Sequence, residues 1–232
     1  MREIIFDTET TGLDNREDRI IEIGGIELDN HFPTGRTFHV YINPGSRKVH
    51  PDALAVHGIT DEFLKDKPGF AEIAGDLIDF FGGARWVAHN ATFDMGFINA
   101  EFTRIGMPAI GNDLVIDTLS MARRKHPMGP NSLDALCRRY GIDNSHRTRH
   151  GALLDSELLA EVYIEMIGGR QAALGLSSSD GRSGQATEVE DIVILTALRP
   201  RPLAPRLTDT EANAHAALIA QMGEKAIWAK YD

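Results

Sequence analysis

The chain has 232 residues, of which 42% are hydrophobic and 25% charged, which is enough for one domain of roughly 150–200 residues and an appendage. Its formal net charge of −10 weighs against a protein that binds duplex DNA tightly by itself, because contacts from lysine and arginine to phosphates normally provide that affinity. No run of about 18 apolar residues and no signal peptide is found, and the single cysteine, Cys137, excludes a disulfide framework, so the sequence predicts a cytoplasmic protein without a membrane span.

The elements expected along the chain indicate an α/β domain. Apolar and β-branched runs predict strands beginning at Arg2 and at 20–29, 37–43, 85–89 and 114–117. Helical patterns predict helices at about 51–57, 69–81, 92–105, 119–125, 132–140 and 151–167, with Thr92 as an N-cap. Three strands followed by alternating helices and strands favour a mixed five-stranded sheet flanked by helices.

The composition changes at Gly168. Residues 169–187 are rich in glycine, serine and alanine and are typical of a flexible linker. The remaining residues, 188–232, contain a strand-like run at 192–198, a proline-broken segment and a final helix that opens at Thr208. The predicted domains are therefore 1–168, 169–187 and 188–232.

Four acidic residues from three distant segments are expected to converge at one edge of the sheet. Asp7 and Glu9 are one residue apart, so a strand would place both side chains on the same face. Asp94 lies in the first turn of a predicted helix, and Asp155 lies within an apolar helical pattern that should face the sheet. Taken singly, each acid has a plain structural explanation, such as a turn after Glu9 or a favourable charge at a helix start.

Carboxylates that converge in this way repel one another unless cations neutralise them. All-oxygen ligands suit Mg²⁺ or Mn²⁺, and two such ions about 4 Å apart can stabilise the attacking and leaving oxygens of a phosphoryl displacement. His150 stands five residues before Asp155. If it lies just ahead of the helix, its pKa suits it to accept a proton from water near neutral pH; a plain exposed loop histidine is the alternative.

Three motifs carry a resemblance to a known family. FDTETTG at 6–12, HNATFD at 89–94 and HGALLD at 150–155 resemble, in this order, the exonuclease motifs of the DEDD superfamily, which has a ribonuclease-H-like fold. The spacing from His150 to Asp155 resembles the histidine subclass, since the tyrosine subclass would have tyrosine in place of Gly151. VHGITDEFL and NSLDALCRRYGIDNS extend the resemblance to the epsilon, or proofreading, subunit family of bacterial DNA polymerase III over about residues 2–176.

This resemblance implies a 3′→5′ exonuclease that uses two divalent cations, Mg²⁺ or Mn²⁺, to release nucleoside 5′-monophosphates from a single-stranded DNA 3′ end. Asp7, Glu9 and Asp155 would bind the cations directly, Asp94 would complete the set, in part through water, and His150 would be the general base.

The same resemblance implies contacts with the substrate. Asp52 and His57 match positions that contact the terminal nucleotide, although the family often has glutamate where Asp52 stands. The expected substrate-binding set is Asp7, Glu9, Asp52, His57 and Asp155. Arg147 and Arg149 are candidates for attracting the phosphate backbone, with solvated loop charges as the equal alternative.

The C-terminal part resembles the family more weakly. QAALGL at 171–176 resembles a sliding-clamp-binding peptide, with Gln171, Leu174 and Leu176 as anchors, and the tail at 188–232 would tether the chain to the polymerase catalytic (alpha) subunit. Two other readings stay open: a free-standing exonuclease of the same superfamily that acts on RNA or oligonucleotides, and a catalytically silent subunit that stabilises a polymerase. The linker and tail weigh against the first, and the complete motif set weighs against the second.

Overall fold

The computed structural model describes residues 1–147, 149–168 and 208–222. These residues fall into two units, which are described separately: the described residues up to 168 belong to the first, and α8 (Asp209–Met222) belongs to the second. No helix within the described residues combines the length and the apolar character that a membrane span requires.

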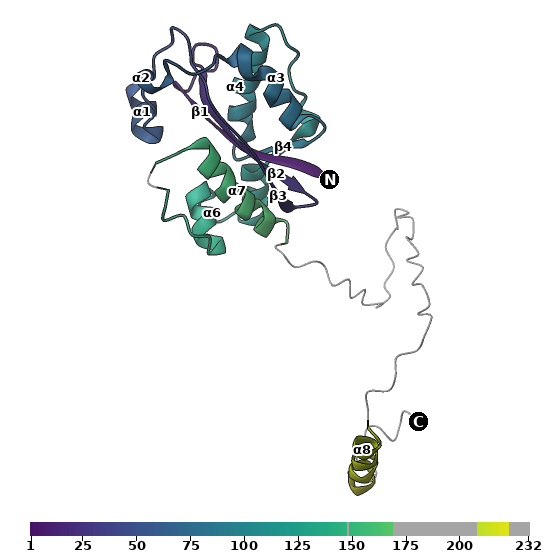
Figure 1. Cartoon of the computed structure of the whole chain (residues 1–232). Helices are drawn as coiled ribbons and strands as arrows, with labels where there is room; N and C mark the ends of the chain where they lie inside the picture. Colours follow the sequence, from purple (N-terminus) through teal and green to yellow (C-terminus); the bar gives the residue numbers. More distant parts are fainter. Residues whose placement is uncertain (148, 169–207, 223–232) are drawn as a thin grey trace, which may run out of the picture. The chain divides into compact units, whose positions relative to one another are not determined.

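A single five-stranded sheet organises the first unit (Figure 1). Its central strand, β1 (Arg2–Thr10), pairs antiparallel with β2 (Ile20–Asp29), which pairs antiparallel with β3 (Phe32–Tyr41). On the other side β1 pairs parallel with β4 (Arg85–Ala88), which pairs parallel with β5 (Val115–Asp117). The order β3-β2-β1-β4-β5 confirms the predicted mixed sheet.

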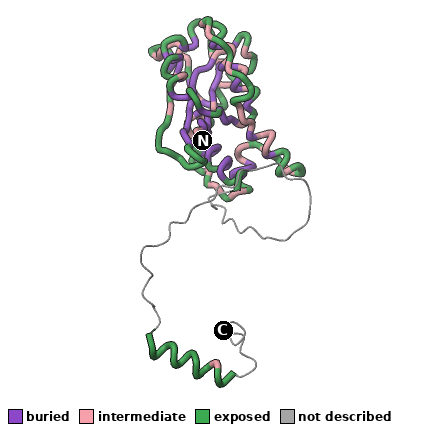
Figure 2. The backbone as a smooth tube through the Cα atoms, turned by 90° about the vertical axis from the view of Figure 1, so that its right-hand side faces the viewer, coloured by how far each residue is buried: buried purple, intermediate pink, exposed green. Residues whose placement is uncertain are grey.

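Helices cover both faces of this sheet (Figure 1). They are α1 (Pro51–His57), α2 (Asp61–Leu64), α3 (Phe70–Phe81), α4 (Ala91–Arg104), α5 (Thr118–Lys125), α6 (Leu133–Tyr140) and α7 (Ala152–Met166), with a 3-10 turn at Asn112–Leu114. Residues of α3 and α4 form one apolar cluster with the sheet, and residues of α7 form a second. Figure 2 shows the buried residues gathered along the sheet between the helices.

Side chains of β1 alternate between these two clusters, and this alternation positions the acids. Ile4 and Phe6 pack with α3 and α4, whereas Ile5 packs with α7. Because the side chains of a strand have a period of two, Asp7 and Glu9 share the face of Ile5 and lie on the α7 side. The strand continues to Thr10, so both acids lie within β1 and not in a turn beyond it.

Some predicted boundaries differ from the structure. The strand expected at 37–43 begins at Phe32, where Asn30 and His31 form a tight hairpin with positive φ angles of 49° and 67°. The prediction that Thr92 caps α4 is wrong, because the N-cap is Asn90 in the left-handed region (φ 67°, ψ 47°). Asparagine tolerates this conformation, and the backbone amide of Asn90 donates to Asp117 at 3.0 Å.

The helix predicted to open at Thr208 is confirmed by α8. The Glu211 amide donates to Thr208 Oγ1 at 3.3 Å, and the Thr208 amide donates to Glu211 Oε2 at 2.9 Å, which is the reciprocal pattern of a capping box. The proposed strand at 192–198 and the clamp-binding residues Gln171, Leu174 and Leu176 lie outside the described residues. The domain boundaries stay predictions.

Candidate active site

The four predicted acids come from three elements that meet at the end of β1. Asp7 and Glu9 lie on β1, Asp94 in the first turn of α4 and Asp155 in the first turn of α7. Asp94 and Asp155 are almost fully buried, and Glu9 is 8% exposed. The Thr8 hydroxyl, on the opposite face of β1 from Asp7 and Glu9, donates to Asp94 Oδ1 at 2.8 Å and ties α4 to the strand.

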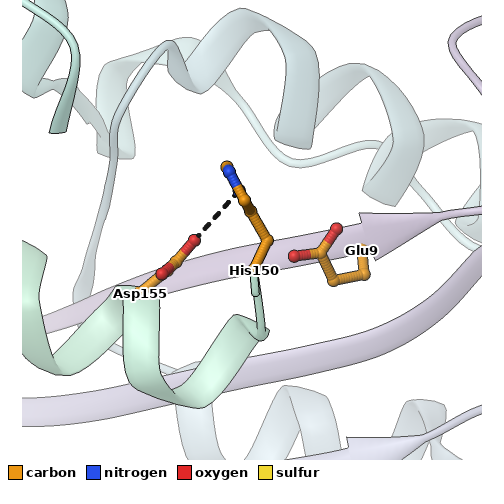
Figure 3. A group of neighbouring side chains, drawn as sticks. All are labelled: Glu9, His150 and Asp155. Atoms are coloured by element: carbon orange, nitrogen blue, oxygen red, sulfur yellow. Dashed lines mark ion pairs between the residues drawn. The ribbon is translucent and has the colours of Figure 1, made fainter. Parts of the chain in front are cut away.

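His150 joins Glu9 and Asp155, as Figure 3 shows. Ligand atoms of the three side chains all lie within 4.8 Å of one another. Because α7 begins at Ala152, His150 lies on the loop just ahead of the helix, as the sequence predicted, and its ring Nδ1 is 3.3 Å from Asp155 Oδ2. Its backbone amide donates to the Val56 carbonyl at 3.3 Å, which places the loop against α1.

Burial and mutual repulsion raise the pKa values of three of the acids. The pKa of Asp7 is raised well above its ordinary value, first by burial and then by the charges of Asp94, Glu9 and Asp155. The pKa of Glu9 rises to about 8, first through burial and then through Asp155. Burial also raises the pKa of Asp94 to about 7, against the opposing hydrogen bond from Thr8.

The arrangement fits divalent cations. Within the part of the chain that the structure describes, no lysine, arginine or histidine forms an ion pair with Asp7, Glu9 or Asp94. Glu9 Oε1 is buried without a hydrogen-bond partner. Among the described residues, only Asp155 of these four carboxylates has an ion-pair partner, so the site leaves oxygen ligands for hard divalent ions, which fits the predicted metal site.

Asp155 differs from the other three acids because it has a cation. Arg147 Nη2 donates to Asp155 Oδ2 at 2.6 Å, and Arg147 Nη1 lies 3.1 Å from Asp134. Burial favours the neutral form of Asp155, yet the hydrogen bonds from Arg147 and His150 outweigh it and lower the pKa of the carboxyl group. The sequence reasoning offered Arg147 as a phosphate contact or, equally, a solvated loop charge, and it missed this pairing. The Arg147 side chain is only 8% exposed, so it is not a solvated loop charge; the phosphate contacts of Arg147 and Arg149 stay predictions.

A pocket of about 490 Å³ opens next to Glu9. Asp52 and His57, both on α1, line it, and their contact with the terminal nucleotide stays a prediction. The Asp52 side chain is 93% exposed, whereas His57 is buried and its pKa is lowered chiefly by that burial. The sequence reasoning did not single out several further lining residues: Leu13, Arg47, His50 and Val56.

Comparisons with known proteins identify the family. A family model described as Exonuclease matches residues 4–163. The chain is 43% identical to DNA polymerase III subunit epsilon of Escherichia coli (strain K12) over 238 aligned residues, which cover 98% of this chain and 97% of that protein. It is 52% identical to the same subunit of Rickettsia felis over 177 residues, 75% of this chain and 77% of that one. This chain belongs to the DNA polymerase III subunit epsilon family. It is therefore an exonuclease, as the three motifs predicted.

Solved structures agree with the fold of this epsilon-family chain. Exonuclease X in complex with 5′ overhanging duplex DNA has a TM-score of 0.54 and 28% identity, covering 72% of this chain and 90% of that chain. The zinc-bound complex of E. coli ExoI with single-stranded DNA has a TM-score of 0.63 and 20% identity, covering 73% of this chain and 41% of that chain. The second likeness shows the fold alone. The roles of the individual site residues stay predictions.

Proposed function

We propose that this chain is the proofreading exonuclease of a replicative DNA polymerase III, which removes mispaired nucleotides from a DNA 3′ end as nucleoside 5′-monophosphates. The observation that carries the proposal is the convergence of Glu9, His150 and Asp155 within 4.8 Å, beside a pocket of about 490 Å³. Family membership supports the reaction class, and the carboxylates that have no ion-pair partner among the described residues, Asp7, Glu9 and Asp94, support its dependence on metal.

The acidic side chains and His150 have different proposed roles, cation binding and proton acceptance. Asp7, Glu9 and Asp155 would hold two divalent cations, Mg²⁺ or Mn²⁺, with Asp94 completing the set. When bound, the cations supply charge neutralisation at the reacting phosphate and activate the attacking water. His150 lies on an exposed loop edge of the site, where its ring would accept a proton from that water. In the metal-free chain Arg147 Nη2 lies 2.9 Å from Nδ1 and 3.3 Å from Nε2 of the same ring.

Pocket residues account for binding of the terminal nucleotide. Asp52 and His57 line the cavity that adjoins Glu9, which supports the proposal that they contact the terminal nucleotide. An unpaired 3′ end separates from its template more easily than a paired one, so selectivity for mismatches can come from the cost of melting and needs no reading of base edges.

The proposed partners are a sliding clamp and a polymerase subunit, which the linker and the tail would bind. Gln171, Leu174 and Leu176 would bind the sliding clamp, and residues 188–232 would bind the polymerase catalytic (alpha) subunit in the cytoplasm. Epsilon-family membership supports an association with the polymerase. A tether raises the local concentration of the nuclease at the primer end. A chain with a net charge of −10 therefore does not need high DNA affinity by itself.

The test is hydrolysis of primers with matched or mismatched 3′ ends in Mg²⁺ or Mn²⁺, and then in EDTA. We expect nucleoside 5′-monophosphate release that is faster on the mismatched end and is abolished by EDTA. His150→Ala should lower the rate by about 10²-fold or more, as expected for loss of a general base. His146→Ala is the matched control, because His146 lies on the same loop, contacts Asp143 and Ser145 of that loop, and should leave the rate unchanged.

Two outcomes would contradict the proposal. A His150→Ala rate within a few-fold of wild type would remove the assigned general base. Equal or faster hydrolysis of single-stranded RNA would favour a free-standing RNA exonuclease over a proofreading subunit.

A further inference from the structure

Glu22 is a buried carboxylate on β2 that lies beside the acidic cluster without being one of the predicted ligands. It is the direct cross-strand partner of Glu9, so both side chains lie on the α7 face of the sheet. Only 2% of Glu22 is exposed, and its charge follows burial and Asp155 among the causes that raise the pKa of Glu9. Such repulsion works against the fold unless Glu22 makes contacts that outweigh it.

Glu22 makes such contacts, and one of them is with the helix that carries Asp155. Its Oε2 accepts a hydrogen bond from the backbone amide of Ala152 at 3.2 Å, and its Oε1 lies 2.7 Å from His39 Nε2 on β3. Ala152 is the first residue of α7, and the N-cap, Gly151, has no side chain that could accept a hydrogen bond. Glu22 therefore supplies from a neighbouring strand the acceptor that the helix start lacks.

The first turn of α7 is also pressed directly onto β2. A Cβ atom at Gly24 would lie 2.3 Å from the carbonyl carbon of Ala152, so only glycine permits this approach. Ser156 Oγ lies 3.0 Å from the Gly24 carbonyl oxygen. Glu22, Gly24 and Ser156 thus fix the start of α7 at one place on the sheet.

That place determines where the reacting groups stand. Ala152 is two residues after His150 and three residues before Asp155. We propose that Glu22 is a positioning residue for the exonuclease reaction, which holds the start of α7 through the Ala152 amide and so sets His150 and Asp155 against Glu9. The inference rests on the proposed function, because it concerns the efficiency of that same site.

Glu3 provides a matched control at the other end of the same helix. It is 1% exposed, its Oε2 lies 2.9 Å from the ring of His31, and its Oε1 accepts from the Tyr163 hydroxyl of α7 at 2.8 Å. Glu3 and Glu22 thus share burial, a histidine partner and a donor from α7. They differ in which end of α7 they contact.

The experiment compares the full chain with its Glu22→Ala, Glu22→Gln, Glu22→Asp and Glu3→Ala variants. Steady-state kinetics on a single-stranded DNA 3′ end in Mn²⁺ give kcat and KM, thermal unfolding gives Tm, and hydrogen exchange gives the protection of the Ala152 amide. Glutamine keeps an acceptor at the right distance without the charge. Aspartate keeps the charge, but its side chain is one methylene shorter and would not reach the Ala152 amide.

We expect Glu22→Ala and Glu22→Asp to lower kcat by about 10–100-fold, the usual effect of removing a group that orients metal ligands, with KM within about threefold of wild type and faster exchange at Ala152. Glu22→Gln should stay within about threefold of wild type in kcat. Glu3→Ala should lower Tm by as much as Glu22→Ala with kcat unchanged.

The inference is overturned if Glu22→Ala keeps wild-type kcat, if Glu3→Ala loses as much kcat as Glu22→Ala, or if aspartate rescues kcat and glutamine does not. Should Glu22→Ala fail to fold, the contrast between glutamine and aspartate decides the question. A wild-type chain without hydrolysis would overturn the proposed function and this inference together, whereas active wild type with unaffected Glu22 variants would overturn this inference alone.

Discussion

Two regions of the molecule bury acidic residues in opposite ways. In the body of the fold each buried glutamate has a partner that can carry positive charge: fully buried Glu101 accepts from Arg19 Nη2 at 2.8 Å, and Glu27 pairs with Arg36 at 2.9 Å. At the far end of β1, Asp7 and Glu9 lie together and, among the described residues, neither has an ion-pair partner.

The difference shows which acids serve the fold and which serve the chemistry. A buried charge costs several kcal/mol unless it is paired, so a stable fold normally pairs its buried acids. The pKa of Glu27 follows this rule: burial would raise it, but hydrogen bonds from Thr34 and Arg2 lower it. The pKa values of Asp7 and Glu9 are raised instead. The end of β1 is therefore the region whose charge we propose is neutralised by bound cations.

The largest effect is expected for a variant of Asp7, which should lose activity and gain stability. Asp7→Asn should lower the hydrolysis rate by about 10³-fold or more, roughly 4 kcal/mol, because a direct cation ligand is lost. In EDTA the same variant should have a higher free energy of unfolding than wild type, since repulsion with Asp94 and Glu9 is removed. Rate assays and urea titrations measure the two effects.

Asp76→Asn is the control for this prediction, because Asp76 is an exposed aspartate on α3, away from the site. It should change neither the rate nor the stability. An Asp7→Asn variant with nearly wild-type activity would show that Asp7 is not a cation ligand.

The opposite behaviour is expected of Glu101. Glu101→Ala should lower the free energy of unfolding by about 3–5 kcal/mol, because it leaves the charge of Arg19 partly buried without its partner. Glu101→Gln keeps an acceptor and should lose less. Urea unfolding measures the change, and activity per folded molecule should stay at the wild-type level; a more stable Glu101→Ala variant would erase the distinction between the two regions.

Much of this contrast was predictable from the sequence, because it depends on local patterns. The strand at 20–29 and the helix at 51–57 were predicted with the bounds that the structure has. Asp7 and Glu9 were predicted to share a face because a strand has a fixed period, and Asp155 was predicted to face the sheet from its apolar neighbours in α7.

The remaining features depend on pairings between distant residues, which local patterns do not carry. Arg147 contacts Asp155 because a loop folds back over the helix start. Glu22 contacts Ala152, 130 residues further along the chain. The left-handed cap at Asn90 depends on hydrogen bonds to Asp117 from β5, so it could be recognised only once the strands were assembled.

A pH titration sharpens the contrast for Glu9. Its ordinary pKa is 4.5 and its folded pKa is about 8, so between these values the folded chain holds a proton that the unfolded chain has released. The free energy of unfolding therefore falls as the pH rises through this window. Glu9→Gln lacks this proton, so in EDTA its stability relative to wild type should grow by about 2–4 kcal/mol between about pH 5 and pH 9, given about 1.4 kcal/mol per pKa unit.

Urea unfolding of both proteins across this pH range measures the difference. Saturating Mn²⁺ should reduce it, because cation binding stabilises only the wild-type site in full. A difference that stays constant with pH would mean that Glu9 does not hold a proton in the metal-free fold.

Arg147 gives the smallest expected effect, and it tests the one acid that belongs to both regions. Asp155 is a predicted cation ligand, yet in the metal-free chain Arg147 pairs with it as arginines pair with structural acids elsewhere. Arg147→Ala should therefore lower the free energy of unfolding by about 1–3 kcal/mol in EDTA, as expected for a hydrogen bond to a charged group. In saturating Mn²⁺ the loss should shrink, since the cations then neutralise Asp155 and the arginine adds less.

Arg149→Ala is the matched control, because Arg149 is an exposed neighbour on the same loop and should give the same small change in both conditions. An Arg147→Ala loss that is equally large with and without Mn²⁺ would place Asp155 among the structural acids and leave the cations to the other three.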